Sequence, residues 1–215
     1  MGNMRKIKKS FIIIMATIVM IGTTGCGSVS KTSNRAIAGI PDPVQKEASG
    51  STSFELDGYD VKIDYKYSYD ISALVVSTHD YSDYDIGGKL APKDLALAWG
   101  PVAEYNDRID FHWRQSNRWY YWETRTYEEI NVVGGEDGVN CHSANNHLVP
   151  ADDAVKKTIK SIDAGDYVRV KGYLVNISAS KPDGTNFWWN SSTERTDTGD
   201  GSCEVIYVTD VEILQ

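Results

Sequence analysis

Strict alternation of residue types in one segment constrains the fold of this chain more than any other feature. From Asp60 to Ile71, charged or small polar side chains alternate with apolar or aromatic ones at every position. A period of two places the apolar side chains on one face of a β-strand and the polar ones on the other. The short apolar run Ala73–Ser77 either continues this strand or begins another after a bend. The sequence therefore predicts a domain built on a sheet with one buried face.

The N-terminus has the composition of an export signal. Residues 1–25 contain no acid and four basic residues, which are Arg5, Lys6, Lys8 and Lys9. The uncharged apolar run from Phe11 to Ile21 is shorter than the roughly 20 residues that span a membrane, so a secretory signal is favoured over a permanent anchor. Thr-Thr-Gly-Cys, ending at Cys26, resembles the lipobox of bacterial lipoproteins. We predict a lipoprotein signal peptide at 1–25 and lipid on Cys26, which becomes the mature N-terminus; the alternatives are an uncleaved anchor and a plain signal peptide.

The charge of the mature chain argues against nucleic-acid binding. Removal of the four basic residues leaves 18 of 22 Lys and Arg against 30 Asp and Glu, a net charge of −12. Nucleic-acid binding normally needs a positive surface that displaces counterions from phosphates. We therefore expect no nucleic-acid partner. The expected partners are a membrane, through the N-terminal lipid, and an unidentified envelope ligand or protein.

One domain accounts for most of the mature chain. Residues 26–52 are rich in Ser, Thr, Gly and Ala and lack sustained periodicity, which predicts a flexible tether. The alternative is that Ile37–Val44 packs on the domain as an edge segment. Residues 53–215 are expected to form a single α+β domain, because 41% of the chain is apolar and that suffices for one core.

Two short helices are predicted. Pro92–Trp99 has Pro near its first turn and is followed by Gly-Pro, the usual punctuation of a helix. The second begins at Asp152 or Asp153 and ends near Gly165, with an apolar stripe of Val155, Ile159 and Ile162.

The segment from Ile109 to Trp122 is the most aromatic part of the chain and predicts a β-hairpin about Ser116-Asn117. Counting outward from this turn pairs Trp113 with Tyr120 and Phe111 with Trp122 on one face. The other face carries His112, Arg114, Trp119 and Tyr121. These side chains either stabilise the sheet or line a binding cleft.

The C-terminal part predicts three strands, at Tyr167–Ser178, Phe187–Asn190 and Cys203–Leu214. The alternation changes phase at Gly172, which is typical of a bulge or a sharp bend. A bent strand followed by hairpins is also how small closed barrels begin. The predicted fold class is α+β, a strongly twisted antiparallel sheet or a partly open, OB-like β-barrel with two short helices.

Candidate chemistry concentrates in a polar segment, Cys141–Pro150, which is interpreted as a long loop. Its candidate site residues are His142, Ser143, Asn145, Asn146 and His147. We predict that they share one binding cleft with the hairpin face that carries His112 and Trp119. Two histidines five apart in a loop can converge on one ion, but nothing fixes the third ligand that a catalytic zinc normally needs. No Gly-x-Ser-x-Gly elbow is present to support a serine nucleophile. The segment is a structural loop, a binding loop or a metal or catalytic loop. We predict no cofactor, and the sequence assigns neither a catalytic residue nor a metal ligand.

Export would allow a disulfide between Cys141 and Cys203. Two separate thiols are the alternative.

Several motifs together resemble a group of uncharacterised exported bacterial proteins. They are Asp94–Gly100, Ser116–Trp122, His142–Leu148, Gly165–Val175, Arg195–Gly199 and Cys203-Glu204. The resemblance spans about Leu90 to Val208 and implies one domain without implying an activity. Cys203 belongs to the pattern and Cys141 does not.

Two functions stay open at this point. The first is a membrane-anchored lipoprotein of the bacterial envelope, facing outside the cytoplasm, with a non-catalytic binding or scaffold domain. The second is an envelope hydrolase that uses the His142/His147 loop, with or without a metal.

Overall fold

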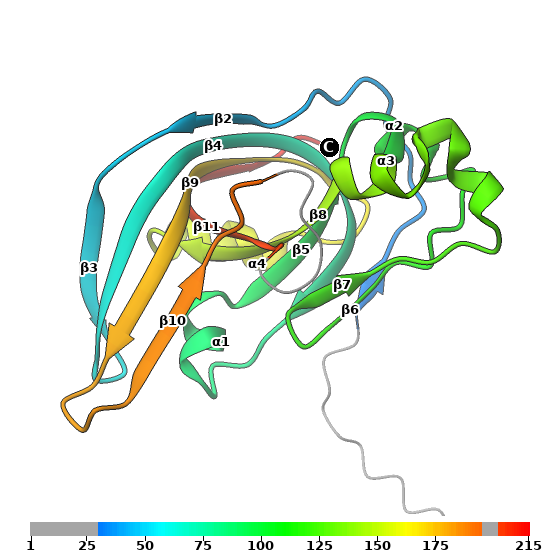
Figure 1. The fold of residues 1–215 in the computed structure, drawn as a ribbon. Coiled ribbons are helices and arrows are strands. Elements are labelled where there is room, and N and C mark those ends of the chain that lie inside the picture. Colours follow the sequence, from blue (N-terminus) through cyan, green and yellow to red (C-terminus); the bar gives the residue numbers. More distant parts are fainter. Residues whose placement is uncertain (1–29, 195–201) are drawn as a thin grey trace, which may run out of the picture.

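The computed structural model describes residues 30–194 and 202–215, which form a strongly curved sheet with short helices around it (Figure 1). The predicted signal peptide, Cys26 and the Arg195–Gly199 motif lie outside the described residues. The fold class is α+β, with many more residues in strands than in helices.

The strands are β1 (Lys31–Thr32), β2 (Val44–Glu47), β3 (Ser51–Leu56), β4 (Tyr59–Asp80), β5 (Lys93–Ala98), β6 (Arg114–Ser116), β7 (Trp119–Tyr121), β8 (Ser143–Pro150), β9 (Tyr167–Ser180), β10 (Asn186–Asn190) and β11 (Glu204–Ile213). The helices are α1 (Ile86–Leu90), α2 (Gly100–Tyr105), the 3₁₀ helix η1 (Tyr127–Val133), α3 (Gly135–Cys141) and α4 (Asp153–Ser161). Among the described residues, no helix has the length and apolar character needed to cross a membrane.

The alternating segment forms β4, a single strand of 22 residues that also includes the apolar run after Ile71. Its middle residues have partners on both edges, since Asp70 pairs with Val44 of β2 and with Lys171 of β9. A register shift between Tyr65 and Tyr67 bends the strand. The prediction of a strand from the period of two is confirmed.

Strand pairing makes the sheet mixed, which corrects the purely antiparallel prediction. β4 pairs with β5, β5 with β8, β11 with β9, and β9 with β4, all antiparallel. The exception is β8, which runs parallel to β11 with His147 opposite Val205. Parallel neighbours need a crossover connection, and the chain between β8 and β11 supplies it with α4, β9 and β10.

The predicted helix at Pro92–Trp99 is wrong, because Lys93–Ala98 forms β5. Every residue of β5 is buried, so the strand lacks the alternation that marks a half-buried one. Nζ of Lys93 donates to the carbonyl oxygens of Lys160 and Ile162 at the end of α4, at 3.1 and 2.6 Å. The Gly-Pro pair interpreted as a stop instead begins α2, where proline is well suited to the first turn.

The tether prediction is wrong from Ser30 onward. β1, β2 and the start of β3 pair with β4 along its length, and Ile40 is buried in the core. Between β1 and β2, the backbone amides of Ser33 and Ile37 donate to the carbonyl oxygens of Val76 and Ala103 and hold this segment on the domain. The alternative of an edge segment packed on the domain matches this arrangement.

The second helix and the C-terminal strands agree with the sequence predictions. Asp152 caps α4 by accepting a hydrogen bond from the amide of Val155 at 2.9 Å, and the apolar stripe of the helix is buried. β9, β10 and β11 occupy the three predicted strand regions. The irregularity predicted at Gly172 is present in the partner strand, where the register of β11 shifts between Val208 and Asp210 opposite this glycine.

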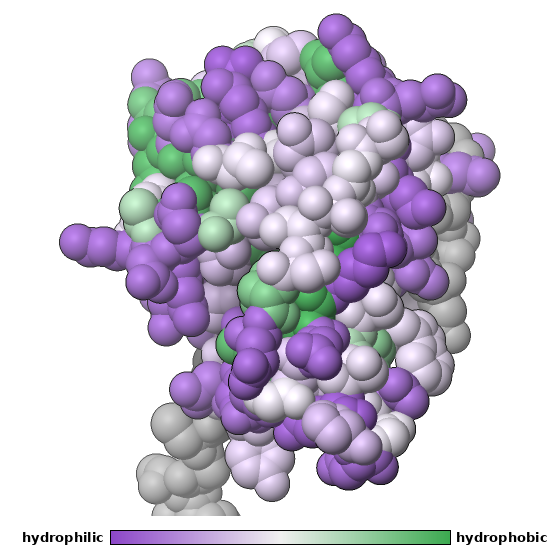
Figure 2. Space-filling view, turned by 90° about the vertical axis from the view of Figure 1, so that its left-hand side faces the viewer, coloured by the Kyte–Doolittle hydropathy of each residue, from purple (hydrophilic) through white to green (hydrophobic). Residues whose placement is uncertain are grey.

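The side of the domain that carries β3, β9 and β10 has mostly hydrophilic or weakly polar side chains on its surface, with apolar residues in small separate patches (Figure 2). Exposed aromatic residues there include Trp188 of β10, which is 73% exposed. The hairpin region described below, in contrast, gathers six aromatic residues around one hollow.

Candidate binding cavity

The aromatic hairpin consists of β6 and β7, joined at Asn117-Arg118, whose φ angles are 52° and 70°. Positive φ at both central positions gives a turn whose twist suits a hairpin. Arg114 pairs with Tyr121 and Ser116 with Trp119. The predicted turn at Ser116-Asn117 was one residue too early, so every cross-strand partner shifts by two positions. A shift of two keeps Arg114, Trp119 and Tyr121 on their predicted face, whereas His112 precedes β6 with a φ of 44°.

Arg118 fixes the tip of this hairpin to the main sheet. Its Nη1 donates to Oδ1 of Asp94 at 2.7 Å and to the carbonyl of Ala91 at 2.9 Å. Its guanidinium lies 3.4 Å from the ring centre of Tyr81 and 5.2 Å from that of Trp189. Planar contact with rings and a fixed fork of donors are properties that lysine lacks.

Asp94 is the buried anion that Arg118 neutralises. Its side chain is 0% exposed, and Oδ2 has no hydrogen-bond partner among the described residues. Nδ1 of His147 lies 2.9 Å from Oδ1, although the alignment is not that of a hydrogen bond. Burial, together with the charge of Asp94, raises the pKa of Tyr81, and burial lowers the pKa of His79. These shifts keep Tyr81 neutral and disfavour protonated His79, which leaves Arg118 as the main counter-charge of Asp94.

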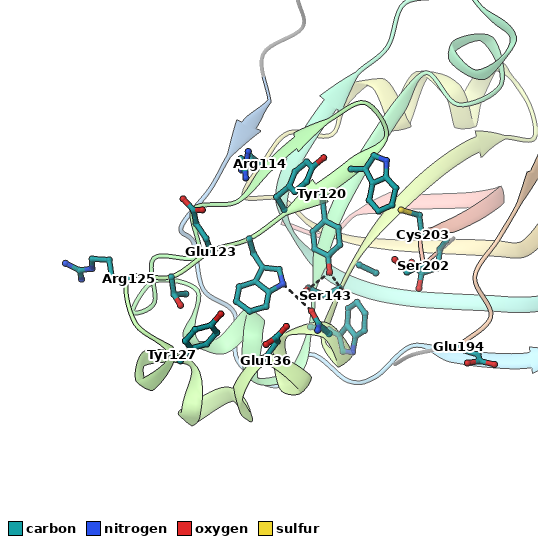
Figure 3. A pocket seen from close by; sticks show the side chains of 18 of the residues that line it. Arg114, Tyr120, Glu123, Arg125, Tyr127, Glu136, Ser143, Glu194, Ser202 and Cys203 are labelled. Atoms are coloured by element: carbon teal, nitrogen blue, oxygen red, sulfur yellow. Dashed lines mark hydrogen bonds between the residues drawn. The ribbon is translucent and has the colours of Figure 1, made fainter. Parts of the chain in front are cut away.

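A cavity of about 490 Å³ lies beside the hairpin (Figure 3). Its walls come from β7 and the chain after it, from α3, and from the starts of β8 and β11. The aromatic residues that line it are Trp99, Trp119, Tyr120, Tyr121, Trp122 and Tyr127. The charged residues are Arg114, Arg125, Glu123, Glu136, Glu194 and Glu204.

Hydrogen bonds hold the aromatic wall in place. The hydroxyl of Tyr120 lies 3.3 Å from both the carbonyl oxygen and Oγ of Ser143, and Nε1 of Trp122 donates to Oδ1 of Asn140 at 3.2 Å (Figure 3). Tyr120 also stacks on the buried ring of Trp113, with centroids 6.3 Å apart. Rings fixed by a second layer of contacts lose little conformational entropy when a ligand binds.

Four of the nine predicted cleft residues line this cavity: Arg114, Trp119, Tyr121 and Ser143. His112 borders a separate hollow, where its Nε2 lies 3.4 Å from Oδ2 of Asp110. The remaining four, His142, Asn145, Asn146 and His147, are not among the lining residues. The prediction of one cleft shared by the hairpin and the polar segment is therefore wrong for most of that segment.

The polar segment is not a loop, because Ser143–Pro150 forms the buried strand β8. Nδ2 of Asn145 donates to the carbonyl of Arg118 at 2.9 Å, and Oδ1 accepts from Nε2 of Gln115 at 2.7 Å. Nδ2 of Asn146 donates to the carbonyl of Ala144 at 3.0 Å. These amides satisfy the hairpin and the strand itself, which is the structural role that the sequence left open.

The two histidines of this segment do not come together. His147 is 2% exposed and packs on Trp189 with ring centroids 4.4 Å apart. His142 precedes the strand, and its Nδ1 bonds the carbonyl of Gly138 at 2.7 Å. Five residues of extended chain span about 16 Å, too far for one ion to bind both side chains. Within the described ranges, no group of three or more His, Cys, Asp or Glu side chains is placed to hold a metal ion.

Of the two alternatives for Cys141 and Cys203, the structure has separate thiols and no disulfide. Cys141 and Cys203 are both thiols and both half-buried. Cys141 ends α3, whereas Sγ of Cys203 lies 3.8 Å from Nδ2 of Asn145 and lines the cavity.

Sequence reasoning missed several wall residues. Trp99 was assigned to a helix, and Tyr120 and Trp122 to the hairpin face opposite the candidate cleft residues. Tyr127 and Glu136 follow the hairpin in a segment without regular periodicity. The sequence signal that could have found them is the run of four consecutive aromatic residues at Trp119–Trp122, which places rings on both faces of β7 and just beyond it.

Chemically, the cavity combines flat apolar rings with carboxylates and few cations. Rings stack on flat or weakly polar ligand faces, and carboxylates accept hydrogen bonds from hydroxyl or amide groups. Among the described lining residues, four carboxylates against two guanidinium groups disfavour an anionic ligand.

Comparison of the chain with protein-family models, curated proteins and solved structures found no match. The resemblance to exported bacterial proteins therefore stays a prediction.

Proposed function

We propose that this protein is a lipid-anchored component of the bacterial envelope whose domain is an OB-like, partly open barrel that binds a saccharide in the aromatic cavity. The proposal describes a non-catalytic binding or scaffold protein. The observation that carries it is the cavity itself, where six aromatic residues and four carboxylates surround about 490 Å³.

The strand order supports the OB-like assignment. The pairings β4–β5–β8–β11–β9 return to β4, and the only parallel pair among them is β8 with β11. α4 connects β8 to β9. OB-folds are five-stranded, partly open barrels that bind oligonucleotides or oligosaccharides at one face and its loops. This likeness of fold gives a preference between ligand classes, and the site has to supply the function.

The charge of the site favours a saccharide over an oligonucleotide. The mature chain carries a net charge of −12, and carboxylates outnumber guanidinium groups at the cavity. A phosphate backbone would be repelled both by the net negative charge of the chain and by the carboxylates of the cavity. A neutral sugar presents C–H faces for the rings and hydroxyl or amide donors for Glu123 and Glu136.

Replacement of Trp119 by Ala should weaken saccharide binding by about fivefold or more, because loss of a central aromatic contact costs about 1 kcal/mol or more. The probe is a neutral tetramer of β-1,4-linked N-acetylglucosamine, titrated calorimetrically into the chain from residue 27 onward. Trp188→Ala is the matched control, since Trp188 is exposed and lies outside the cavity. Binding that both variants retain at the wild-type level would contradict the assignment to this cavity, and no binding of the tetramer by the wild type would contradict the ligand class.

Replacement of Cys26 by Ser should stop lipidation and release the protein from the membrane fraction, or stop its processing. The measurement is the intact mass of the native protein together with membrane fractionation of both forms. A mature protein without lipid mass on Cys26 would overturn the anchoring proposal.

A further inference from the structure

We propose that the anchored domain lies on the membrane with the β6–β7 hairpin toward the lipid headgroups, so that the aromatic cavity opens beside the membrane surface. The inference rests on the proposed function, because it requires lipid on Cys26. It follows from how early in the chain the folded structure begins.

Ser30 already belongs to the folded domain. Its Oγ lies 2.8 Å from Oγ of Ser77 in β4 and accepts a hydrogen bond from the amide of Gln115 in β6 at 3.2 Å. β1 follows directly and pairs with β4, with Lys31 opposite Thr78. The chain thus enters the fold at the junction of the main sheet and the hairpin, as β1 and β6 show in Figure 1.

Contacts after β1 hold the following residues in the domain, so they cannot detach and lengthen the link to the lipid. Nδ2 of Asn106 donates to the carbonyls of Ser33 and Arg35 at 3.0 and 2.8 Å. Asn106 is itself buried and accepts from Nε1 of Trp113 at 2.7 Å. Nη1 of Arg35 donates to the carbonyl of Gly165 at 2.8 Å. If these residues detached from the domain to lengthen the tether, buried polar groups of the core would lose their hydrogen-bond partners.

Ser30 is therefore only four residues along the chain from the lipid-bearing Cys26. A chain of four residues spans at most about 14 Å when fully extended. A compact domain of this size has a radius of about 20 Å, as its expected radius of gyration is about 16 Å. Because the link is shorter than the radius, the domain cannot turn its far side to the membrane, and the surface around Ser30 must face the headgroups.

The cavity shares that surface. Arg114, the neighbour of the residue that binds Ser30, lines the cavity, and so do Trp119 and Tyr121 on the paired strand. Arg114 is exposed and its guanidinium lies 4.6 Å from the ring centre of Tyr121. A cation beside an amphipathic ring suits the polar headgroup layer. A ligand of the cavity would consequently bind close to the membrane and not in an outer layer of the envelope.

The test compares two exposed serines at different distances from the entry point. Ser116 lies in β6, next to Gln115, and Ser49 follows Ala48, whose amide bonds the carbonyl of Lys66 on a distant part of β4. Ser116→Cys and Ser49→Cys are labelled with the same thiol-reactive fluorophore in the full-length lipidated protein, which is reconstituted in vesicles with nitroxide-labelled headgroups. The protein without an added cysteine gives the background from its two half-buried thiols.

The expected result is several-fold stronger quenching at Ser116→Cys than at Ser49→Cys. Insertion of about 20 Gly and Ser residues between Ser28 and Val29, a spacer of about 25 Å, should remove the difference. Protein that fails to float with the vesicles would overturn lipid anchoring and thus the proposed function. Protein that floats but is quenched equally at both positions would overturn only the orientation, and a difference that persists with the spacer would overturn the tether-length argument.

Discussion

Replacement of Arg118 by Ala should lower the free energy of unfolding by about 3–5 kcal/mol, because removal of one partner of a buried ion pair leaves the other charge uncompensated. Asp94 is 0% exposed and receives its closest hydrogen bond, at 2.7 Å, from Arg118. The substitution also removes the cation from between Tyr81 and Trp189. Urea denaturation of the chain from residue 27 onward measures the loss.

Arg114→Ala is the matched control for this experiment. Arg114 lies on the same hairpin and also contacts a tyrosine ring, but it is exposed and has no buried anion as partner. Its replacement should cost about 1 kcal/mol or less. Adding Asp94→Asn to Arg118→Ala should recover part of the stability, because the buried charge is then gone. An Arg118→Ala loss no larger than that of Arg114→Ala would show that Arg118 is not the counter-charge on which Asp94 depends.

The same residue explains why the hairpin register could not be predicted from local sequence. Positive φ favours Gly, Asn or Asp, so Asn117 was a good turn residue and Arg118 was not. Arg118 nevertheless adopts a φ of 70°, because its side chain and its amide are tied to Asp94 and to the hydroxyl of Tyr81. Those partners are 24 and 37 residues away in sequence. Tertiary contacts thus determine the position of the hairpin turn.

Burial explains which strands could be predicted. β4 was predictable because one of its faces is buried and the other is exposed for much of its length, which produces the period of two. β5 and β8 are buried on both faces, so that Lys93–Ala98 resembled a helix and the polar β8 resembled a loop. The side-chain amide of Asn145 in β8 bonds Gln115 and Arg118 of the hairpin. Nothing in the sequence near β8 indicates that such partners exist.

The candidate cavity was predictable only in part for a similar reason. The hairpin face that carries Arg114, Trp119 and Tyr121 follows from local alternation and survived the change of register. The opposite wall comes from α3 and from the start of β11, which meet the hairpin only in the folded chain. The entry segment at Ser30 was missed likewise, since its pairing partner on β4 lies 47 residues away.

Replacement of Gly172 by Ala should be as damaging as the loss of Arg118, with a loss of more than about 3 kcal/mol or failure to fold. A Cβ at this position would lie 2.0 Å from the carbonyl oxygen of Tyr207 and 2.9 Å from its carbonyl carbon. The neighbour is backbone of β11, and β9 is held between β4 and β11, so neither strand can move aside without breaking the pairing.

Gly87→Ala is the control for Gly172→Ala. The nearest atom to a Cβ at Gly87 is Oδ1 of Asp85 at 3.4 Å, and the residue lies in α1, where Ala is the better helix former. This change should leave stability unchanged or raise it by about 1 kcal/mol. Thermal unfolding of both variants gives the comparison. A Gly172→Ala protein as stable as Gly87→Ala would mean that β9 and β11 do not approach each other as closely as the register shift at Val208 requires.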